Sequence, residues 1–457
     1  MKKFLILILT YSFLAQAGVD DLRNAPNSFV VDGLKAVFVD FKKVTYNIVY
    51  DFKSESAEVE TTILFVAKES GMPIFDSVEK PKAVWIEGQE VDSKIVITPG
   101  ETTAVRYAQI NIQANRPYTM KIRTPLKKGT KYGYKGVSSG FFIKDLKNRE
   151  MLEQYVPTNL EYDQYPMTWH VEILNANHRW HDIFANGVVE NYAQNKFTVK
   201  MPDHYTASSV FFHLVPRRKF WRYYLRYRSI NGRLFPVTIY SSFRWLNGML
   251  KRKAFKVLAE LERDYGPYPH PSLVIYGPSK FRGGMEYVGA TATSVVSLGH
   301  ELHHMWFAKG VMPADGNAGW MDEGLASWRD KGYQTLEKPF YFSANLGHHN
   351  PYTRKTDKRS YEYGRSFFGY IDYQLKAAGL AGLKDFLKLW ATKKMFKSVT
   401  TEDFISELEA YSGMDFRSDF SQYVYGGYAK GNSRSPAVEP INEHHPDYTQ
   451  EELDEMI

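Results

Sequence analysis

A pentapeptide in the second half of the chain carries two imidazoles and a carboxylate in a pattern suited to metal chemistry. It reads His300-Glu301-Leu302-His303-His304, and in a helix His300 and His304 lie one above the other on one face. Two imidazoles so placed can share one zinc ion, while Glu301 can take a proton from a water that the metal activates. The alternative is a surface helix that happens to carry three histidines.

A third ligand is available further along the chain. Because a catalytic zinc needs a third protein ligand, we expect Glu323, at the start of a second predicted helix, to complete a His, His, Glu set for one zinc ion per chain. Asp330 lies on the same helical face as Glu323, so it could orient a ligating imidazole, or it could be an unrelated surface acid. The chain has no Cys, so any metal site must use His, Asp or Glu.

The other clustered histidines do not fit this pattern. His303 is off the ligand face, and the pairs His348-His349 and His444-His445 lack ligand spacing on a helix. We expect all of them to be structural or exposed.

The elements that must hold these residues change character near the middle of the chain. From about residue 30 to 230 the pattern has period two and predicts antiparallel strands, for example at Val37–Phe41, Ala108–Ile112 and Phe197–Met201. Beyond Gly232 helical patterns dominate. The later predictions are strands at Val237–Ser241 and Leu273–Tyr276, and helices at Trp245–Tyr265, Ser294–Ala308, Glu323–Gly332, Ser366–Ala378 and Leu383–Lys394.

We therefore expect an α+β multidomain fold. Residues 1–17 have the Lys2-Lys3 pair, short apolar run and Ala-Gln-Ala end of a signal peptide, which predicts export to the periplasm or out of the cell. An N-terminal antiparallel β domain would cover 18–230, a mainly α domain 231–430, and a linker with an acidic tail 431–457. No later segment offers about 20 consecutive apolar residues, so no integral membrane segment is expected in the mature chain.

A basic stretch interleaved with aromatic residues, Arg217–Arg228, raises the question of an anionic partner. It could suit nucleic acid or an anionic surface, but a solvated strand face is the favoured interpretation. We expect no nucleic-acid partner.

Four segments of the second half share motifs with one known family. They are His300–Phe307 as a zinc helix, Trp320–Ser327 as a third-ligand segment, Gly283–Tyr287 as a Gly-x-Met-Glu-Asn signature with Tyr in the Asn place, and Tyr361–Gly364 as a Tyr-x-x-Gly segment. On these motifs the chain resembles the gluzincin aminopeptidases typified by membrane alanyl aminopeptidase and leukotriene hydrolase, from about Phe141 to Gly427. The resemblance implies a thermolysin-like zinc catalytic domain over 231–430.

The resemblance also implies roles for individual residues. Glu301 would act as the general base, and the phenol of Tyr361 would donate to the oxyanion of the reacting carbonyl. Glu286, in a substrate-binding segment with Gly283, Gly284 and Met285, would pair with the free α-amino group of a peptide and so restrict cleavage to its first residue.

Three departures from the family affect these implied roles. In the segment Gln154-Tyr155-Val156, Val156 stands where the family has a second acceptor for the amine, so Gln154 takes over, or another residue does, or Glu286 acts alone. The spacings from Glu286 to His300 and from Glu323 to Tyr361 are shorter than usual. After Gly427 no counterpart of the family's helical C-terminal domain follows, so we expect a more open cleft.

The sequence thus favours an exported zinc aminopeptidase acting on peptide substrates. A zinc endopeptidase, or another hydrolase with the same centre, is the nearest alternative. A non-catalytic, zinc-containing peptide-binding protein is a third, and Glu301 weighs against it because a purely structural zinc site gains nothing from a base beside the metal.

Overall fold

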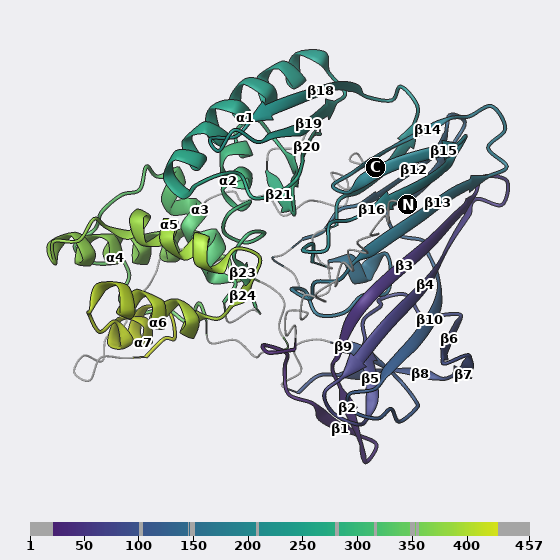
Figure 1. The fold of residues 1–457 in the computed structure, drawn as a ribbon, viewed down its shortest axis with the longest axis horizontal. Coiled ribbons are helices and arrows are strands. Elements are labelled where there is room, and N and C mark those ends of the chain that lie inside the picture. The colour runs from purple at the N-terminus through teal and green to yellow at the C-terminus, as the bar shows by residue number, and fades with distance from the viewer. Residues whose placement is uncertain are drawn as a thin grey trace, which may run out of the picture.

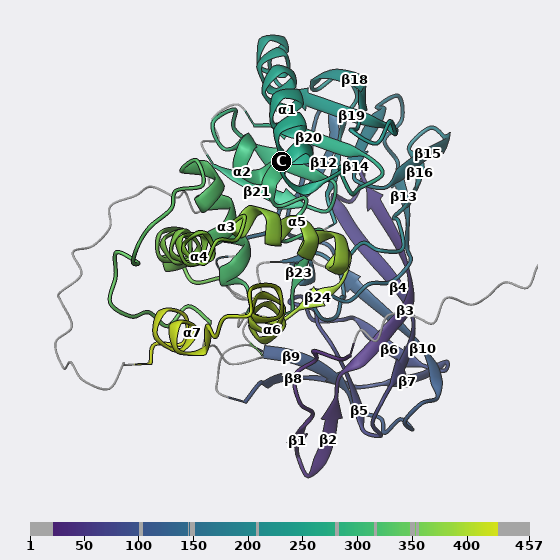
Figure 2. The same cartoon turned by 60° about the vertical axis from the view of Figure 1, so that its left-hand side comes forward.

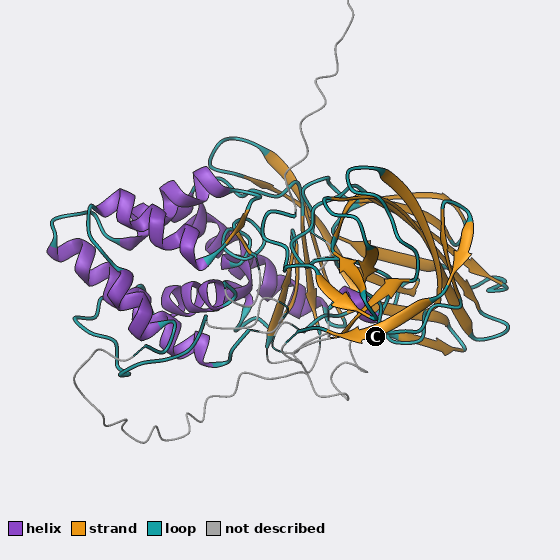
Figure 3. Ribbon diagram, turned by 90° about the horizontal axis from the view of Figure 1, so that it is seen from below, coloured by secondary structure: helices purple, strands orange, loops and turns teal. Residues whose placement is uncertain are grey.

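The computed structural model describes residues 22–99, 104–144, 146, 151–206, 210–278, 283–314, 318–347, 352 and 356–427. Strands fill the first half and helices dominate the second, so the predicted α+β order is confirmed. In Figure 1 the strands of the first half lie on the right and helices α4 to α7 on the left, and Figure 3 shows the same separation from below. The predicted signal peptide and acidic tail lie outside the described residues.

Three sheets build the first half. The eight-stranded sheet has the order β15 (Val188–Ala193), β16 (Lys196–Lys200), β13 (Met167–Leu174), β3 (Val39–Asp51), β4 (Ser56–Ala67), β10 (Pro117–Pro125), β6 (Ala83–Ile86) and β7 (Gln89–Val91). A five-stranded sheet has the order β1 (Phe29–Val31), β2 (Leu34–Val37), β5 (Met72–Phe75), β9 (Ala104–Ala108) and β8 (Ser93–Ile97). A four-stranded sheet has the order β11 (Thr130–Gly133), β12 (Gly136–Phe141), β17 (Phe212–Pro216) and β14 (His181–Ala185).

Most neighbouring strands of this half are antiparallel, as predicted, but β2 with β5 and β13 with β3 are parallel. The strand predicted at Ala108–Ile112 is wrong beyond its first residue. β9 ends at Ala108, and the N–H of Ile110 donates to the carbonyl of Ala108 at 2.8 Å, which closes a tight turn. Alternating apolar residues can therefore also line a turn that packs against the core.

The second half begins with a mixed sheet in the order β18 (Trp221–Arg228), β19 (Leu234–Ser241), β20 (Leu273–Gly277), β22 (Ala290–Thr293) and β21 (Gly284–Tyr287). The hairpin of β18 and β19 spans the boundary we placed at residue 230, so β18 shares a sheet with the strands that follow it. Strand β18, at the sheet edge, carries arginines and aromatic residues, and Arg222 forms an ion pair with Asp182 at 3.0 Å.

The helices are α1 (Arg244–Tyr265), α2 (Leu298–His303), α3 (Trp320–Asp330), α4 (Arg365–Ala377), α5 (Leu383–Lys394), α6 (Thr401–Ser412) and α7 (Arg417–Tyr423), with the turns η1 (Leu152–Gln154) and η3 (Ser360–Gly364) and a short strand pair, β23 (Met312–Pro313) and β24 (Ser398–Val399). The predictions for α1, α3, α4 and α5 are confirmed within a few residues. Among the described residues, no helix combines the length and apolar character needed to cross a bilayer.

The helix predicted at Ser294–Ala308 is shorter than expected. Regular α-helix covers only Leu298–His303, because the N–H groups of Met305 and Trp306 bond three residues back and tighten the last turn. His304 keeps helical dihedral angles, so it stays on the same face as His300 despite the shortening, and the two rings meet edge-on.

One hydrophobic core crosses between the two halves. It joins strands of the first half to Tyr276, Met285 and Tyr287 of the mixed sheet, and the N–H of Ile143 donates to the phenol of Tyr287 at 3.3 Å. Figure 2 shows β20 and β21 lying close to β12 and β14. Strand β21, which carries Glu286, is therefore held by the first half of the chain.

The contact between α3 and η3 depends on two glycines. A Cβ on Gly364 would lie 2.8 Å from the Cα of Gly324, although the backbone of Gly364 (φ −58°, ψ −48°) suits alanine. We predict that Gly364→Ala lowers the free energy of unfolding by about 1–3 kcal/mol through overpacking, as measured by chemical denaturation. Gly248→Ala in α1, where a Cβ meets nothing within 4 Å, is the control. Unchanged stability of Gly364→Ala would mean that this backbone contact is not tight.

Candidate metal and catalytic site

Two short helices bring the predicted metal ligands together. His300 and His304 of the α2 turn have ring centroids 4.8 Å apart, and Glu323 comes from the first turn of α3. Glu323 Oε2 lies 2.9 Å from His300 Nε2 and 3.6 Å from His304 Nε2. The ligand atoms of the three buried residues all lie within 4.8 Å of one another, which is the arrangement expected of a shared metal.

One buried atom in this group lacks a hydrogen-bond partner among the described residues. His304 is fully buried, its Nδ1 donates to the carbonyl of Phe307 at 3.2 Å, and its Nε2 has no such partner. Because buried polar atoms are almost always satisfied, this nitrogen fits a metal ligand. Two imidazoles and one carboxylate are the donor set of a catalytic zinc site, so these residues fit zinc.

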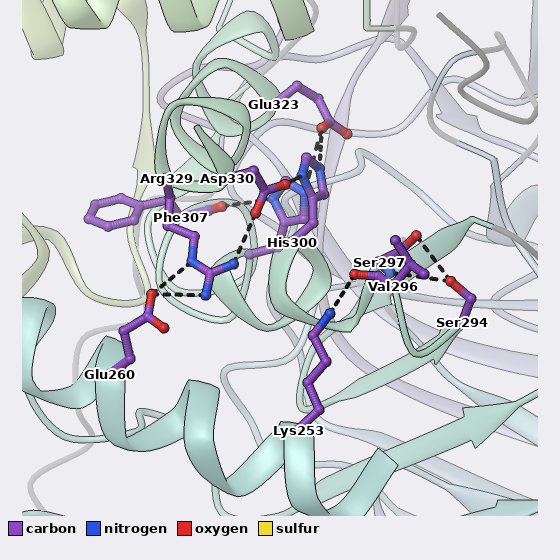
Figure 4. A network of polar contacts seen from close by, with 11 residues as sticks. Lys253, Glu260, Ser294, Val296, Ser297, His300, Phe307, Glu323, Arg329 and Asp330 are labelled. Carbon is purple, nitrogen blue, oxygen red and sulfur yellow. Dashed lines mark hydrogen bonds and ion pairs between the residues drawn. The ribbon is translucent and has the colours of Figure 1, made fainter. Parts of the chain in front are cut away.

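Asp330 lies behind His300 rather than on an unrelated surface. Its Oδ2 accepts from His300 Nδ1 at 2.8 Å, which leaves Nε2 for the metal. Arg329 continues this chain, because it contacts Asp330 Oδ1 at 2.9 Å and donates twice to Glu260 of α1. Figure 4 shows Glu260, Arg329, Asp330 and His300 in succession, with Lys253 of α1 donating to the carbonyl of Val296 just before α2. Helix α1 thus supports the ligand helix at two points.

The electrostatics of the cluster favour a cation between these side chains. Burial alone would raise the pKa of Glu323, but His304 and His300 hold that pKa well below its usual range. Burial opposes charge on His300, yet Asp330 and Glu323 raise its pKa well above its ordinary value. The carboxylates thus stabilise positive charge at the point where the ligand atoms meet.

Glu301 is buried beside the cluster, and its position requires a glycine opposite it. A Cβ on Gly284 would overlap the carboxylate of Glu301, so only glycine at that point of β21 leaves room for it. Burial, reinforced by the charge of Glu286, raises the pKa of Glu301 to about 8. A carboxylate so disposed is suited to accept a proton.

A second group could also hold a metal, because atoms of Glu286, Glu301 and His304 lie within 4.8 Å of one another. That set has a single imidazole, and it would use Glu301 as a metal ligand, so that Glu301 could no longer act as a base. The set would also compete with an ion pair, since Glu286 Oε1 lies 3.4 Å from Lys309 Nζ. The His300, His304 and Glu323 set is therefore the better zinc site.

Tyr361 and Tyr363 of η3 lie in different surroundings. Tyr361 is half-buried, and its ring stacks on that of His300 with centroids 6.0 Å apart. Tyr363 is buried in the helical core, where it stacks on Tyr341 at 4.3 Å. Of the two, Tyr361 is the one whose ring contacts a predicted metal ligand.

The segment predicted to bind substrate runs along the edge strand β21. Gly283 accepts a hydrogen bond from Ser294 N at 2.9 Å, and Met285 belongs to the shared core. Glu286, only 3% exposed, lies near the cluster, as expected, but a cation of the chain already contacts it. Sequence reasoning missed that cation, Lys309, and the only available signal was a lysine a few residues after the ligand helix.

Gln154 is occupied elsewhere among the described contacts. Its carboxamide oxygen accepts from Lys128, and its nitrogen donates to the carbonyl of Met151 at 3.1 Å. Val156 is buried in the core of the first half. No described contact joins Gln154 to Glu286.

Of the remaining histidines, His303 is fully buried and packs between Tyr265 and Phe307. This is the structural role expected for it. The pairs His348-His349 and His444-His445 lie outside the described residues.

Solved structures share this architecture. An M1 zinc metallopeptidase from Deinococcus radiodurans matches with a TM-score of 0.61 and 15% identity, over 89% of this chain and 97% of its own. The fold is that of the two-domain M1 zinc metallopeptidases. Yeast LTA4 hydrolase in complex with bestatin matches with a TM-score of 0.60 and 15% identity over 89% of this chain and 69% of its own. Legionella pneumophila aminopeptidase A matches with a TM-score of 0.64 and 14% identity, over 85% of this chain and 50% of its own.

The similarity is found by comparing structures and not by comparing sequences. No protein-family model matches the chain, and a search of curated proteins finds no relative. At 15% identity or less the likeness shows the M1 fold alone, so the chemistry is argued from the site.

We predict that the purified protein binds one zinc ion per chain and that His304→Ala loses it, because two protein ligands hold zinc weakly. Zinc is measured by plasma mass spectrometry after gel filtration. His178→Ala, at an exposed histidine, is the control and should stay fully loaded. Full zinc in His304→Ala would exclude His304 as a ligand.

We predict that Gly284→Ala keeps its zinc but loses at least about tenfold in kcat, because the three atoms nearest to the new Cβ all belong to the side chain of Glu301, the predicted general base, which must move. Zinc content and steady-state peptide hydrolysis are measured on the same preparation. Gly248→Ala serves as the matched control. Native turnover in Gly284→Ala would show that Glu301 is not held by this contact.

Proposed function

We propose that the protein is a zinc-dependent metallopeptidase, with aminopeptidase activity as the leading form. The observation that carries the proposal is the buried Glu301, which lies next to the His300, His304 and Glu323 set without belonging to it. A structural zinc site has no use for such a base. The M1 fold of the chain supports the same activity.

When bound, zinc would act as a Lewis acid that activates a water and polarises the carbonyl of the scissile bond. Glu301 would take the proton of that water and deliver it to the leaving amine. Tyr361, beside His300, would donate a hydrogen bond from its phenolic O–H to the developing oxyanion. Asp330 keeps His300 in the tautomer that directs Nε2 to the metal.

Strand β21 supports a peptide as the substrate. It is the last strand of the mixed sheet, so one side of its backbone pairs with no described strand. An extended peptide can add to such an edge. One M1 zinc metallopeptidase matching this fold was solved with a Tyr-Ser-Ala substrate.

Cleavage at the first residue would follow if Glu286 receives the substrate's α-ammonium. A zinc endopeptidase is the second candidate, and the ion pair between Lys309 and Glu286 is what favours it. We also propose that the protein is exported, to the periplasm or the extracellular space, on the signal-peptide pattern of residues 1–17.

We predict that Glu301→Gln and Tyr361→Phe both keep zinc, that Glu301→Gln lowers kcat by about 10²–10⁴-fold and that Tyr361→Phe lowers it by about 10²–10³-fold. Each variant removes a group that acts on the reaction rather than on the metal. Tyr363→Phe is the matched control, because its ring packs in the core. Equal losses in Tyr361→Phe and Tyr363→Phe, or unchanged turnover in Glu301→Gln, would contradict these roles.

A further inference from the structure

The carboxylate that would receive a substrate's amine already has a cation of the chain beside it. Lys309 Nζ lies 3.4 Å from Glu286 Oε1, and the two side chains are only 10% and 4% exposed. In such a water-poor place the attraction between opposite charges is little screened. The attraction within the pair is therefore less screened than in an ion pair on the surface, and removing one partner would leave a buried charge uncompensated.

The backbone after the ligand helix is folded so that Lys309 reaches this point. The N–H of Lys309 donates to the carbonyl of His304 at 2.9 Å, and the N–H of Val311 donates to that of Trp306 at 2.7 Å. Ala308 has φ 136°, a region that favours glycine, and a Cβ on Gly310 would lie 2.6 Å from the carbonyl oxygen of Trp306. A strained non-glycine residue next to a site indicates that the surrounding structure fixes this turn.

A fixed cation changes what Glu286 can recognise. An ammonium entering beside Glu286 is attracted by one carboxylate and repelled by the ammonium of Lys309, so its net electrostatic gain is small. A substrate with a blocked amine or an internal peptide segment meets no such repulsion and leaves no buried carboxylate unpaired.

We infer that Lys309 is a specificity-determining residue, which supplies from within the chain the positive charge that Glu286 would otherwise take from a substrate, so that the site accepts peptides without a free α-amino group. The inference rests on the proposed peptidase function and extends its substrate class from free N-termini to blocked peptides and internal segments. Lys309 acts through Glu286 and takes no part in proton transfer.

The experiment compares a neutral pentapeptide with its N-acetylated form, using kcat/KM from mass spectrometry of the products. For the native enzyme we expect the ratio of free to acetylated kcat/KM to be about threefold or less. Lys309→Met removes the competing charge and should raise that ratio at least tenfold, because a charged hydrogen bond to the substrate's amine is then restored. Lys309→Arg keeps the charge and should keep the native ratio.

Glu286→Ala in the Lys309→Met background should return the ratio to about the native value, since the acceptor is gone. Lys309→Gln replaces Lys309→Met if the latter fails to fold. A native ratio of tenfold or more, or a ratio that neither Lys309→Met nor Lys309→Gln raises, would overturn the inference.

A binding measurement separates this inference from the proposed function. Calorimetry of the same two peptides on zinc-loaded Glu301→Gln, with and without Lys309→Met, reports recognition without turnover. If the native protein cleaves neither peptide, the proposed function fails. Even then, the binding measurement tests the role of Lys309. The ratio of the Kd of the acetylated peptide to the Kd of the free peptide should rise at least tenfold when Lys309 is replaced by Met, and an unchanged ratio contradicts that role.

Discussion

The buried contact of Glu323 with His300 and His304 is the interaction on which the rest of the site depends. It joins the first turn of α3 to α2, and both helices are too short to hold this geometry alone. Hydrogen bonds that run from His300 through Asp330 and Arg329 to Glu260 of α1 hold the two helices in place. The close glycine contact of α3 with η3 holds α3 from another side. A long helix and a tightly packed core thus fix the positions of the three predicted ligands.

The same site buries an unusual amount of negative charge. Glu286, Glu301, Asp322 and Glu323 are all less than a tenth exposed, and burial raises the pKa of Asp322 to about 8. Buried carboxylates need cations or hydrogen-bond donors close by. A zinc ion between His300, His304 and Glu323 would supply two positive charges, and Lys309 supplies one from the chain itself. The metal and the lysine thus contribute to one charge balance, in which Lys309 forms an ion pair with Glu286 and also opposes the rise in the pKa of Asp322.

The sequence predicts this site well where spacing along one helix determines it, and poorly where the chain folds back. His300 with His304 on one face, and Glu323 with Asp330 on the next helix, follow from helical periodicity, and the long helices α1, α4 and α5 follow from the same pattern. The turn at Ile110 could not be predicted, because alternation of apolar residues does not distinguish a strand from a buried turn. Lys309 could not be assigned either, since its contact with Glu286 depends on the backbone at Ala308 and on a strand that lies earlier in the chain.

The central claim is that His300, His304 and Glu323 bind zinc while Glu301 stays free. Diffraction from a crystal of the zinc-loaded protein, recorded on both sides of the zinc absorption edge, tests it most directly. The account predicts one anomalous peak about 2.0–2.2 Å from His300 Nε2, His304 Nε2 and a Glu323 oxygen, with Glu301 outside coordination distance. A peak bound by Glu286, Glu301 and His304 instead, or no zinc between the two imidazoles, would contradict it.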